Sequence, residues 1–165
     1  EPAQYWKKIY SRAGADYRKM NYVRTIVGNT EIIPYYNCEV FAVRSSAGIF
    51  GEWKEILKNL IDDNSFQAES CREFMNRLFL HQAVLSAVTM AKIPENRIGK
   101  LPLKCGYPFN QHDRLDRNQK VRTLNECSVV IFDRSLTMDP GWYERIPVTG
   151  GLGEWLVRTW GLIFH

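Results

Sequence analysis

Apolar residues recur at helical spacing in four stretches of the chain. The clearest stretch places six apolar residues on one helical face: Ile49, Trp53, Ile56, Leu57, Leu60 and Ile61. We expect the polar residues at 62–65 to end this helix. The same spacing predicts helices at 3–12, at 68–91 with a break near Leu80, and at 154–164.

Two other segments are typical of β-strands. Residues 35–44 follow Pro34, and the second half of the segment is apolar on both faces, as in a strand buried inside an α/β sheet. Residues 128–132 form a second apolar run, which ends at Asp133. We expect the first strand to pack against the clearest helix through these residues: Val40 and Val43 on the strand, and Trp53, Ile56, Leu57 and Leu60 on the helix.

Helices and strands alternate along the chain, which predicts an α/β fold in a single domain, with a mixed sheet flanked by helices. Gly28-Asn29 is typical of a turn, and residues 94–118 are mostly irregular and rich in Pro and Gly. A loop of that length inside a compact domain more often carries function than not. Two strands are too few for a complete sheet, which indicates that the remaining strands belong to a preceding part of the protein.

The charge of the chain is mildly basic, with a formal net charge of +4 over 165 residues. Basic residues gather between Lys7 and Arg24, and this segment has two interpretations. It is either a solvated basic face or a patch that attracts the phosphate groups of a sugar nucleotide, a phospholipid or a nucleic acid. No known nucleic-acid-binding motif accompanies it, so we expect no nucleic-acid partner.

The four cysteines, Cys38, Cys71, Cys105 and Cys127, contain no C-x-x-C pair, which argues against a zinc site. Three lie in apolar surroundings and are interpreted as buried free thiols of a reducing compartment, although two disulfides remain an alternative. The chain has no apolar run of 18 residues and no signal peptide. We therefore expect a soluble, cytoplasmic protein. Because the sequence begins with Glu1 rather than Met, we also expect a fragment.

Polar residues interrupt or bound the apolar segments in three places. Asn37 and Glu39 lie in the first strand, His81 and Gln82 lie in an apolar helix, and Asp133 follows the second strand. Each has a structural alternative: a turn or cap residue for Asn37 and Asp133, a core histidine, and a glutamine bonded to a loop carbonyl. The motifs of serine hydrolases, P-loop proteins, dinucleotide-binding domains and zinc proteases are absent. The glycines at 150–153 follow no strand and are interpreted as a hinge.

Four segments, in this order, resemble GT-A-type nucleotide-diphospho-sugar transferases. Residues 34–44, PYYNCEVFAVR, resemble the family segment PYFNAGVVAVR, and residues 78–86, LFLHQAVLS, resemble its helix with a DQ or HQ pair. Residues 101–110 are similar to an LP-x-x-YN-x-P loop, with the order of Gly106-Tyr107-Pro108 changed. Residues 129–142 are similar to the strand and turn that carry a late histidine in the family.

The resemblance implies transfer of a sugar from a nucleoside-diphosphate sugar to an acceptor hydroxyl, on a glycan or another molecule. It places neutral hydrogen-bonding groups beside the transferred sugar, as recognition of a hydroxyl-rich ring requires. By this resemblance, the catalytic residues are His81 and Gln82, and Asp133 is the metal ligand. The substrate-binding residues are Asn37, Glu39, Tyr107, Asn110 and Trp142, with Tyr107 or Trp142 stacking on the sugar. We expect Asn37, Gln82 and the loop 107–110 to converge on one cleft.

Three departures from the family pattern weigh on this interpretation. Glu39 stands where the family has Gly, and Phe132-Asp133 replaces the late metal-binding His. The D-x-D motif, which holds a divalent ion at the diphosphate, is absent. We therefore expect a missing N-terminal, nucleotide-binding half, with Mn²⁺ or Mg²⁺ in the full-length parent, and no transfer by this chain alone. The alternatives are a degenerate, non-catalytic domain that binds a glycan or a protein, and an unrelated α/β binding module.

Overall fold

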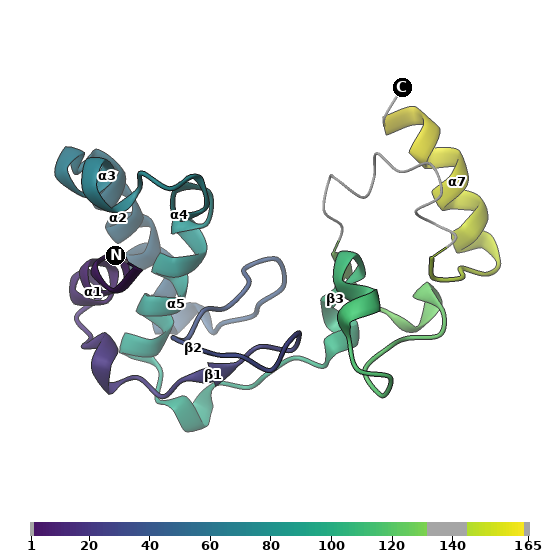
Figure 1. Ribbon diagram of the computed structural model, residues 1–165, viewed down its shortest axis with the longest axis horizontal. Helices are drawn as coiled ribbons and strands as arrows, with labels where there is room; N and C mark the ends of the chain where they lie inside the picture. The colour runs from purple at the N-terminus through teal and green to yellow at the C-terminus, as the bar shows by residue number, and fades with distance from the viewer. Residues whose placement is uncertain (1, 132–144, 164–165) are drawn as a thin grey trace. The chain divides into compact units, whose positions relative to one another are not determined.

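The computed structural model describes residues 2–131 and 145–163 (Figure 1). These residues divide into two compact units, where the sequence predicts a single domain. Of the described residues, unit 1 comprises 2–25 and 29–99, and unit 2 comprises 26–28, 100–131 and 145–163. Within the described ranges, no helix is both long and apolar enough to cross a membrane.

Unit 1 is predominantly helical. Its five α-helices are α1 (Pro2–Arg12), α2 (Ile49–Asp62), α3 (Asn64–Ser70), α4 (Phe74–Leu78) and α5 (Leu80–Lys92). Short 3₁₀ helices lie at Tyr17–Lys19, Ser45–Ala47 and Glu95–Arg97. The helix predicted at 68–91 is three helices, and the expected break near Leu80 is confirmed at Phe79, between α4 and α5.

The central element of unit 1 is α5, which packs between α1 and α2. Residues 82–88 of α5 are all buried, so almost every side of the helix is covered along two turns. The predicted apolar face of α2 contributes Ile49, Ile56 and Leu60 to this core, with Trp53 and Leu57 half-buried. Ile61, which was expected on the same face, is 55% exposed. One residue of helix turns a side chain by about 100°, so Ile61 points away from the face that Leu60 occupies.

A small hairpin confirms the predicted turn. Strands β1 (Val23–Arg24) and β2 (Glu31–Ile32) pair antiparallel, with Val23 opposite Ile32. Gly28 and Asn29 both have positive φ, at 79° and 48°. Glycine and asparagine are the residues that tolerate this left-handed conformation best.

The strand predicted at 35–44 is wrong, because residues 34–44 form neither helix nor strand. A strand needs a neighbour for its backbone groups, and none of the described strands pairs with this segment. Side chains supply partners instead: the Tyr36 amide donates to Ser86 Oγ, and the Glu39 amide donates to Asn37 Oδ1. The apolar face of α2 packs on α5 rather than on a strand. Val43 is half-buried and packs against the core of unit 1.

Unit 2 is built largely from short elements. They are the 3₁₀ helices at Leu103–Cys105, Phe109–Arg114 and Leu124–Glu126, the strands β3 (Tyr107–Pro108) and β4 (Val130–Ile131), and α7 (Gly151–Ile163). Strands β3 and β4 pair in parallel, with Tyr107 opposite Val130. The strand expected at 128–132 is therefore present only at Val130–Ile131 of the described residues. The glycine hinge expected at 150–153 is wrong, because α7 begins at Gly151.

The described residues thus combine helices with two two-stranded sheets, and helix predominates. The larger mixed sheet that the sequence predicts is not among them. All four cysteines are free, which agrees with the thiol interpretation. Only Cys71 is buried, however, whereas Cys38, Cys105 and Cys127 are half-buried, so the expectation of three buried thiols is wrong.

Candidate functional site

Two segments that are distant in sequence meet in unit 1 through a short hydrogen-bond network. The Tyr35 hydroxyl donates to Gln82 Oε1 over 2.7 Å, and the Tyr36 amide donates to Ser86 Oγ over 2.8 Å. The Ser86 hydroxyl donates in turn to the Gln82 carbonyl over 2.8 Å. Burial raises the pKa of Tyr35 to about 12, so its hydroxyl keeps its proton at neutral pH. The segment 34–44 is therefore hydrogen-bonded to α5 at Gln82 and Ser86.

Gln82 is the most deeply placed of the sequence-predicted site residues in unit 1. Its side chain is only 6% exposed, and Oε1 is engaged by Tyr35. Its Nε2 makes no hydrogen bond with another described residue. A buried donor without a partner costs about 1–3 kcal/mol.

Asn37 and Glu39 lie at the surface of unit 1. Asn37 Oδ1 accepts the Glu39 amide proton over 2.9 Å, which forms a local turn of the kind that asparagine favours. The Asn37 Nδ2 donors and the Glu39 carboxylate pair with no other described residue, and both residues are exposed. Asn37 therefore offers a fixed amide with free donors, two residues beyond the Tyr35 contact.

His81 is half-buried in the first turn of α5. Its carbonyl oxygen accepts the indole proton of Trp53 over 2.8 Å, which ties α5 to α2. The imidazole ring makes no hydrogen bond with another described residue. The backbone of His81 is thus held in place, and its ring nitrogens are available to a ligand.

The candidates in unit 2 are placed differently. Tyr107 has no exposed surface, and its hydroxyl lies 2.7 Å from His112 Nδ1 and accepts the Val121 amide proton over 3.3 Å. Its ring is part of the core of unit 2 and presents no face to a sugar, which argues against the stacking expected for it.

Asn110 is half-buried in the 3₁₀ helix at Phe109–Arg114. Because Asn37 and Gln82 belong to unit 1, the convergence of all these residues on one cleft stays a prediction.

The expected metal ligand Asp133 and the expected stacking residue Trp142 lie outside the described residues. In the ranges that the structure does describe, no group of three or more His, Cys, Asp and Glu side chains is placed to hold a metal ion.

Sequence reasoning missed two clefts that flank α1 in unit 1. The larger, of about 770 Å³, lies between α1 and the segment from α3 to α4, and the smaller, of about 360 Å³, lies between α1 and the start of α3. Both are lined in part by Gln4 and Lys8, so they adjoin at these side chains. No motif marks them, because their residues come together only when the helices pack.

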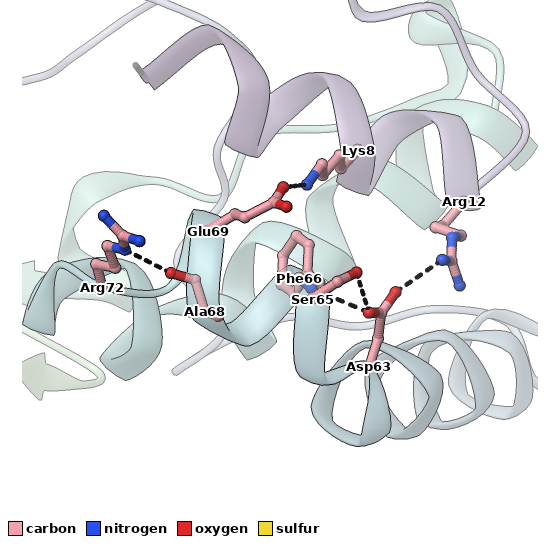
Figure 2. Close-up of polar contacts among 8 residues, drawn as sticks. All are labelled: Lys8, Arg12, Asp63, Ser65, Phe66, Ala68, Glu69 and Arg72. Carbon is pink, nitrogen blue, oxygen red and sulfur yellow. Dashed lines mark hydrogen bonds and ion pairs between the residues drawn. The ribbon is translucent and has the colours of Figure 1, made fainter.

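Ion pairs near these clefts account for much of the basic segment between Lys7 and Arg24 (Figure 2). Lys8 pairs with Glu69 at 2.6 Å, and Arg12 pairs with Asp63 at 3.0 Å. Hydrogen bonds from the Phe66 amide and the Ser65 hydroxyl, and then the charge of Arg12, lower the pKa of Asp63. The carboxylate therefore stays ionised and keeps its partner.

Further along this segment, Arg18 pairs with Asp16 and Arg24 pairs with Glu31. Four of its cations are thus matched by local acids, which favours the solvated face over a phosphate patch.

Comparison of the chain with protein-family models, with curated proteins and with solved structures finds no match. The resemblance to nucleotide-sugar transferases therefore rests on the quoted segments.

Proposed function

We propose that this chain belongs to a glycosyltransferase that moves a sugar from a nucleoside-diphosphate sugar to an acceptor hydroxyl, and that unit 1 contacts the transferred sugar. The observation that carries the proposal is the hydrogen bonding of Tyr35 and Tyr36 to Gln82 and Ser86. These residues belong to the two segments whose sequences resemble the sugar-contacting parts of the family. Segments separated by more than 30 residues of chain meet as a shared ligand site requires.

In this proposal the residues of unit 1 recognise hydroxyl groups. The Nε2 of Gln82 and the Nδ2 of Asn37, which have no partner in the described part of the chain, donate to sugar oxygens. The His81 imidazole either donates or accepts according to its tautomer. The Tyr35 hydroxyl holds Gln82 Oε1, which orients the amide so that its donors point away from Tyr35. Neutral donors of this kind discriminate strongly against ligands that lack the matching hydroxyl.

The remaining parts of the proposal concern the whole protein. A divalent ion and the nucleotide-binding groups are assigned to the full-length parent, and the proposed location is the cytoplasm, supported by the four free cysteines. This chain alone is expected to release no nucleoside diphosphate from nucleotide sugars with Mn²⁺, because it lacks the D-x-D motif. Metal-dependent turnover that Asp133→Asn abolishes would contradict this expectation.

A second candidate function is a non-catalytic domain that binds a glycan or a protein. It is favoured by the exposed side chain of Glu39, where the family has glycine at the substrate. Assays of the longest natural form of the protein separate the two: a transferase releases nucleoside diphosphate from its donor, and a degenerate domain binds without turnover.

The proposed site is tested by two variants that differ only in position. Asn37→Asp keeps the oxygen that accepts the Glu39 amide proton but removes the Nδ2 donors, so the local turn survives while sugar recognition is lost. Asn59→Asp introduces the same charge on an exposed position of α2 and is the control.

Binding of UDP-glucose, UDP-N-acetylglucosamine and GDP-mannose is measured by thermal shift with Mn²⁺, on the 165-residue chain and on its longest natural form. We expect Asn37→Asp to weaken binding about tenfold or more, the loss of a hydrogen bond or two, and Asn59→Asp to leave it unchanged. Equal affinities for the two variants, or no binding of any nucleotide sugar by either form, would contradict the proposal.

A further inference from the structure

The larger cleft of unit 1 lies on the face of α1 opposite the segment 34–44. Trp6 and Tyr10 of α1 face that segment: the rings of Trp6 and Tyr35 are 5.9 Å apart, and the Tyr10 hydroxyl donates to the Pro34 carbonyl over 3.0 Å. Gln4 and Lys8 instead line the cleft towards α3. The cleft is therefore separate from the contact between Tyr35 and Gln82.

The walls of this cleft are held by hydrogen bonds between the helices. The Tyr5 hydroxyl of α1 donates to the Asn76 carbonyl of α4 over 3.1 Å, and Asn76 Nδ2 donates to the Ser70 carbonyl at the end of α3 over 2.9 Å. These bonds fix the spacing of three elements around a volume of about 770 Å³. Ligand pockets typically have volumes of about 300–1,000 Å³.

The charges of the described lining residues cancel. Lys8 and Arg72 supply two positive charges, and Glu69 and Glu73 supply two negative charges. Lys8 and Glu69 are already paired at 2.6 Å (Figure 2). A balanced lining of this kind offers no net attraction to a nucleoside diphosphate or another anion, and it favours a neutral ligand.

The groups left free in the cleft include both hydrogen-bond donors and acceptors. The Nε of Arg72 donates to the Ala68 carbonyl over 2.6 Å (Figure 2), which anchors the guanidinium and leaves both terminal nitrogens without a partner among the described residues. The Glu73 carboxylate and the Gln4 amide make no hydrogen bond with another described residue. Sugar hydroxyls each donate and accept, so they match a mixture of free guanidinium, carboxylate and amide groups.

A peptide would need a different lining. Peptide recognition relies on apolar pockets for side chains or on an unpaired strand edge. The one aromatic side chain in the lining, Tyr5, is only 5% exposed.

We propose that this cleft is a binding site for a neutral oligosaccharide, distinct from the sugar-transfer contact and independent of the proposed function. In the binding site, Arg72 donates to sugar oxygens, and Glu73 accepts from sugar hydroxyls.

The test is an NMR titration of the isotopically labelled 165-residue chain with chitotriose, cellotriose and mannotriose, up to about 10 mM so that even a millimolar Kd is detected. We expect saturable shifts of the Arg72 and Glu73 amides and the Gln4 side-chain amide with at least one trisaccharide. Glu73→Gln and Arg72→Ala should each weaken the affinity about tenfold or more, as loss of a hydrogen bond to a charged group does. Glu55→Gln, an exposed position on α2, is the matched control and should bind like the unaltered chain.

Three results would overturn the proposal. One is the absence of a saturable shift with any trisaccharide, and another is binding that neither Glu73→Gln nor Arg72→Ala weakens. The third is an equal response to triglycine, which would assign the cleft to peptides. None of these results bears on Asn37 and Gln82, so the proposed function would be tested separately.

Discussion

The two compact units build their cores in different ways. Unit 1 surrounds α5 with α1 and α2, and apolar side chains from three helices fill the space between them. Unit 2 has a smaller core of residues from short elements and connecting segments, and its centre is Tyr107 with a hydrogen-bonded hydroxyl. The comparison teaches that, among the described residues, long helices supply the core of unit 1 whereas short elements supply the core of unit 2. Each core also contains a buried polar contact, at Ser86 in unit 1 and at Tyr107 in unit 2.

The largest expected effect is a cavity in the core of unit 1. Leu60 is 1% exposed and its neighbour Ile61 is exposed, although both lie on α2. Leu60→Ala should lower the free energy of unfolding by about 2–5 kcal/mol, because it leaves a cavity, and Ile61→Ala should change it by under about 0.5 kcal/mol. Leu57→Ala should fall between them, because Leu57 is half-buried. Denaturant unfolding followed by tryptophan fluorescence measures all three. Equal losses of unfolding free energy in Leu60→Ala and Ile61→Ala would contradict the burial of Leu60 and the exposure of Ile61 on α2.

A smaller loss is expected in unit 2 when the Tyr107 hydroxyl is removed. Tyr107→Phe leaves the Val121 amide without its acceptor in a buried place, which costs about 1–3 kcal/mol. Hydrogen exchange should therefore speed up at the Val121 amide. Tyr22→Phe removes the hydroxyl of an exposed tyrosine and should leave exchange unchanged. Unchanged exchange at Val121 in Tyr107→Phe would contradict the account of unit 2.

The smallest expected effect is a dependence of the stability of unit 2 on pH. Burial, and then the charge of Lys120, lower the pKa of His112 below its usual 6.5. The unfolded chain therefore binds this proton more readily than the folded chain does. The stabilisation is complete above pH 6.5 and is lost as the pH falls towards the folded pKa.

The Tyr107 hydroxyl and His112 Nδ1 lie 2.7 Å apart, and protonation of the ring leaves Nδ1 able only to donate in this contact. His112→Asn keeps an acceptor but does not titrate, so it should flatten the stability of unit 2 between pH 7 and pH 5, measured by hydrogen exchange at Val121. An unaltered pH profile in this variant would show that His112 is not the responsible group.

Helices α1, α2 and α5 could be predicted because their signals are local, as the apolar face of α2 illustrates. The sequence analysis did not predict α3 as a separate helix, although its cap Asp63, which accepts the Phe66 amide proton, lies directly before it. The segment 35–44 could not be predicted in the same way. Its continuous apolar run suits a buried strand, but strand pairing depends on partners elsewhere in the chain.

The same distinction holds for the candidate site. Polar residues within apolar segments identified Gln82 as unusual, and it is buried with a hydrogen bond to Tyr35. The resemblance assigns Tyr107 to substrate binding, whereas its hydroxyl accepts the Val121 amide proton inside the core of unit 2. The cleft lined by Arg72 and Glu73 had no sequence signal, because three helices create it together.

The central claim is that the contact between the segment 34–44 and α5 is a sugar site. Its most direct test follows the side-chain amide resonances of Asn37, Gln82 and Asn110 while the longest natural form of the protein is titrated with nucleotide sugars. The account predicts that the Gln82 and Asn37 amides shift together and saturate at one concentration, and that Asn110 joins them if the predicted convergence is correct. Saturable binding that leaves both the Gln82 and the Asn37 amides unshifted would contradict the claim.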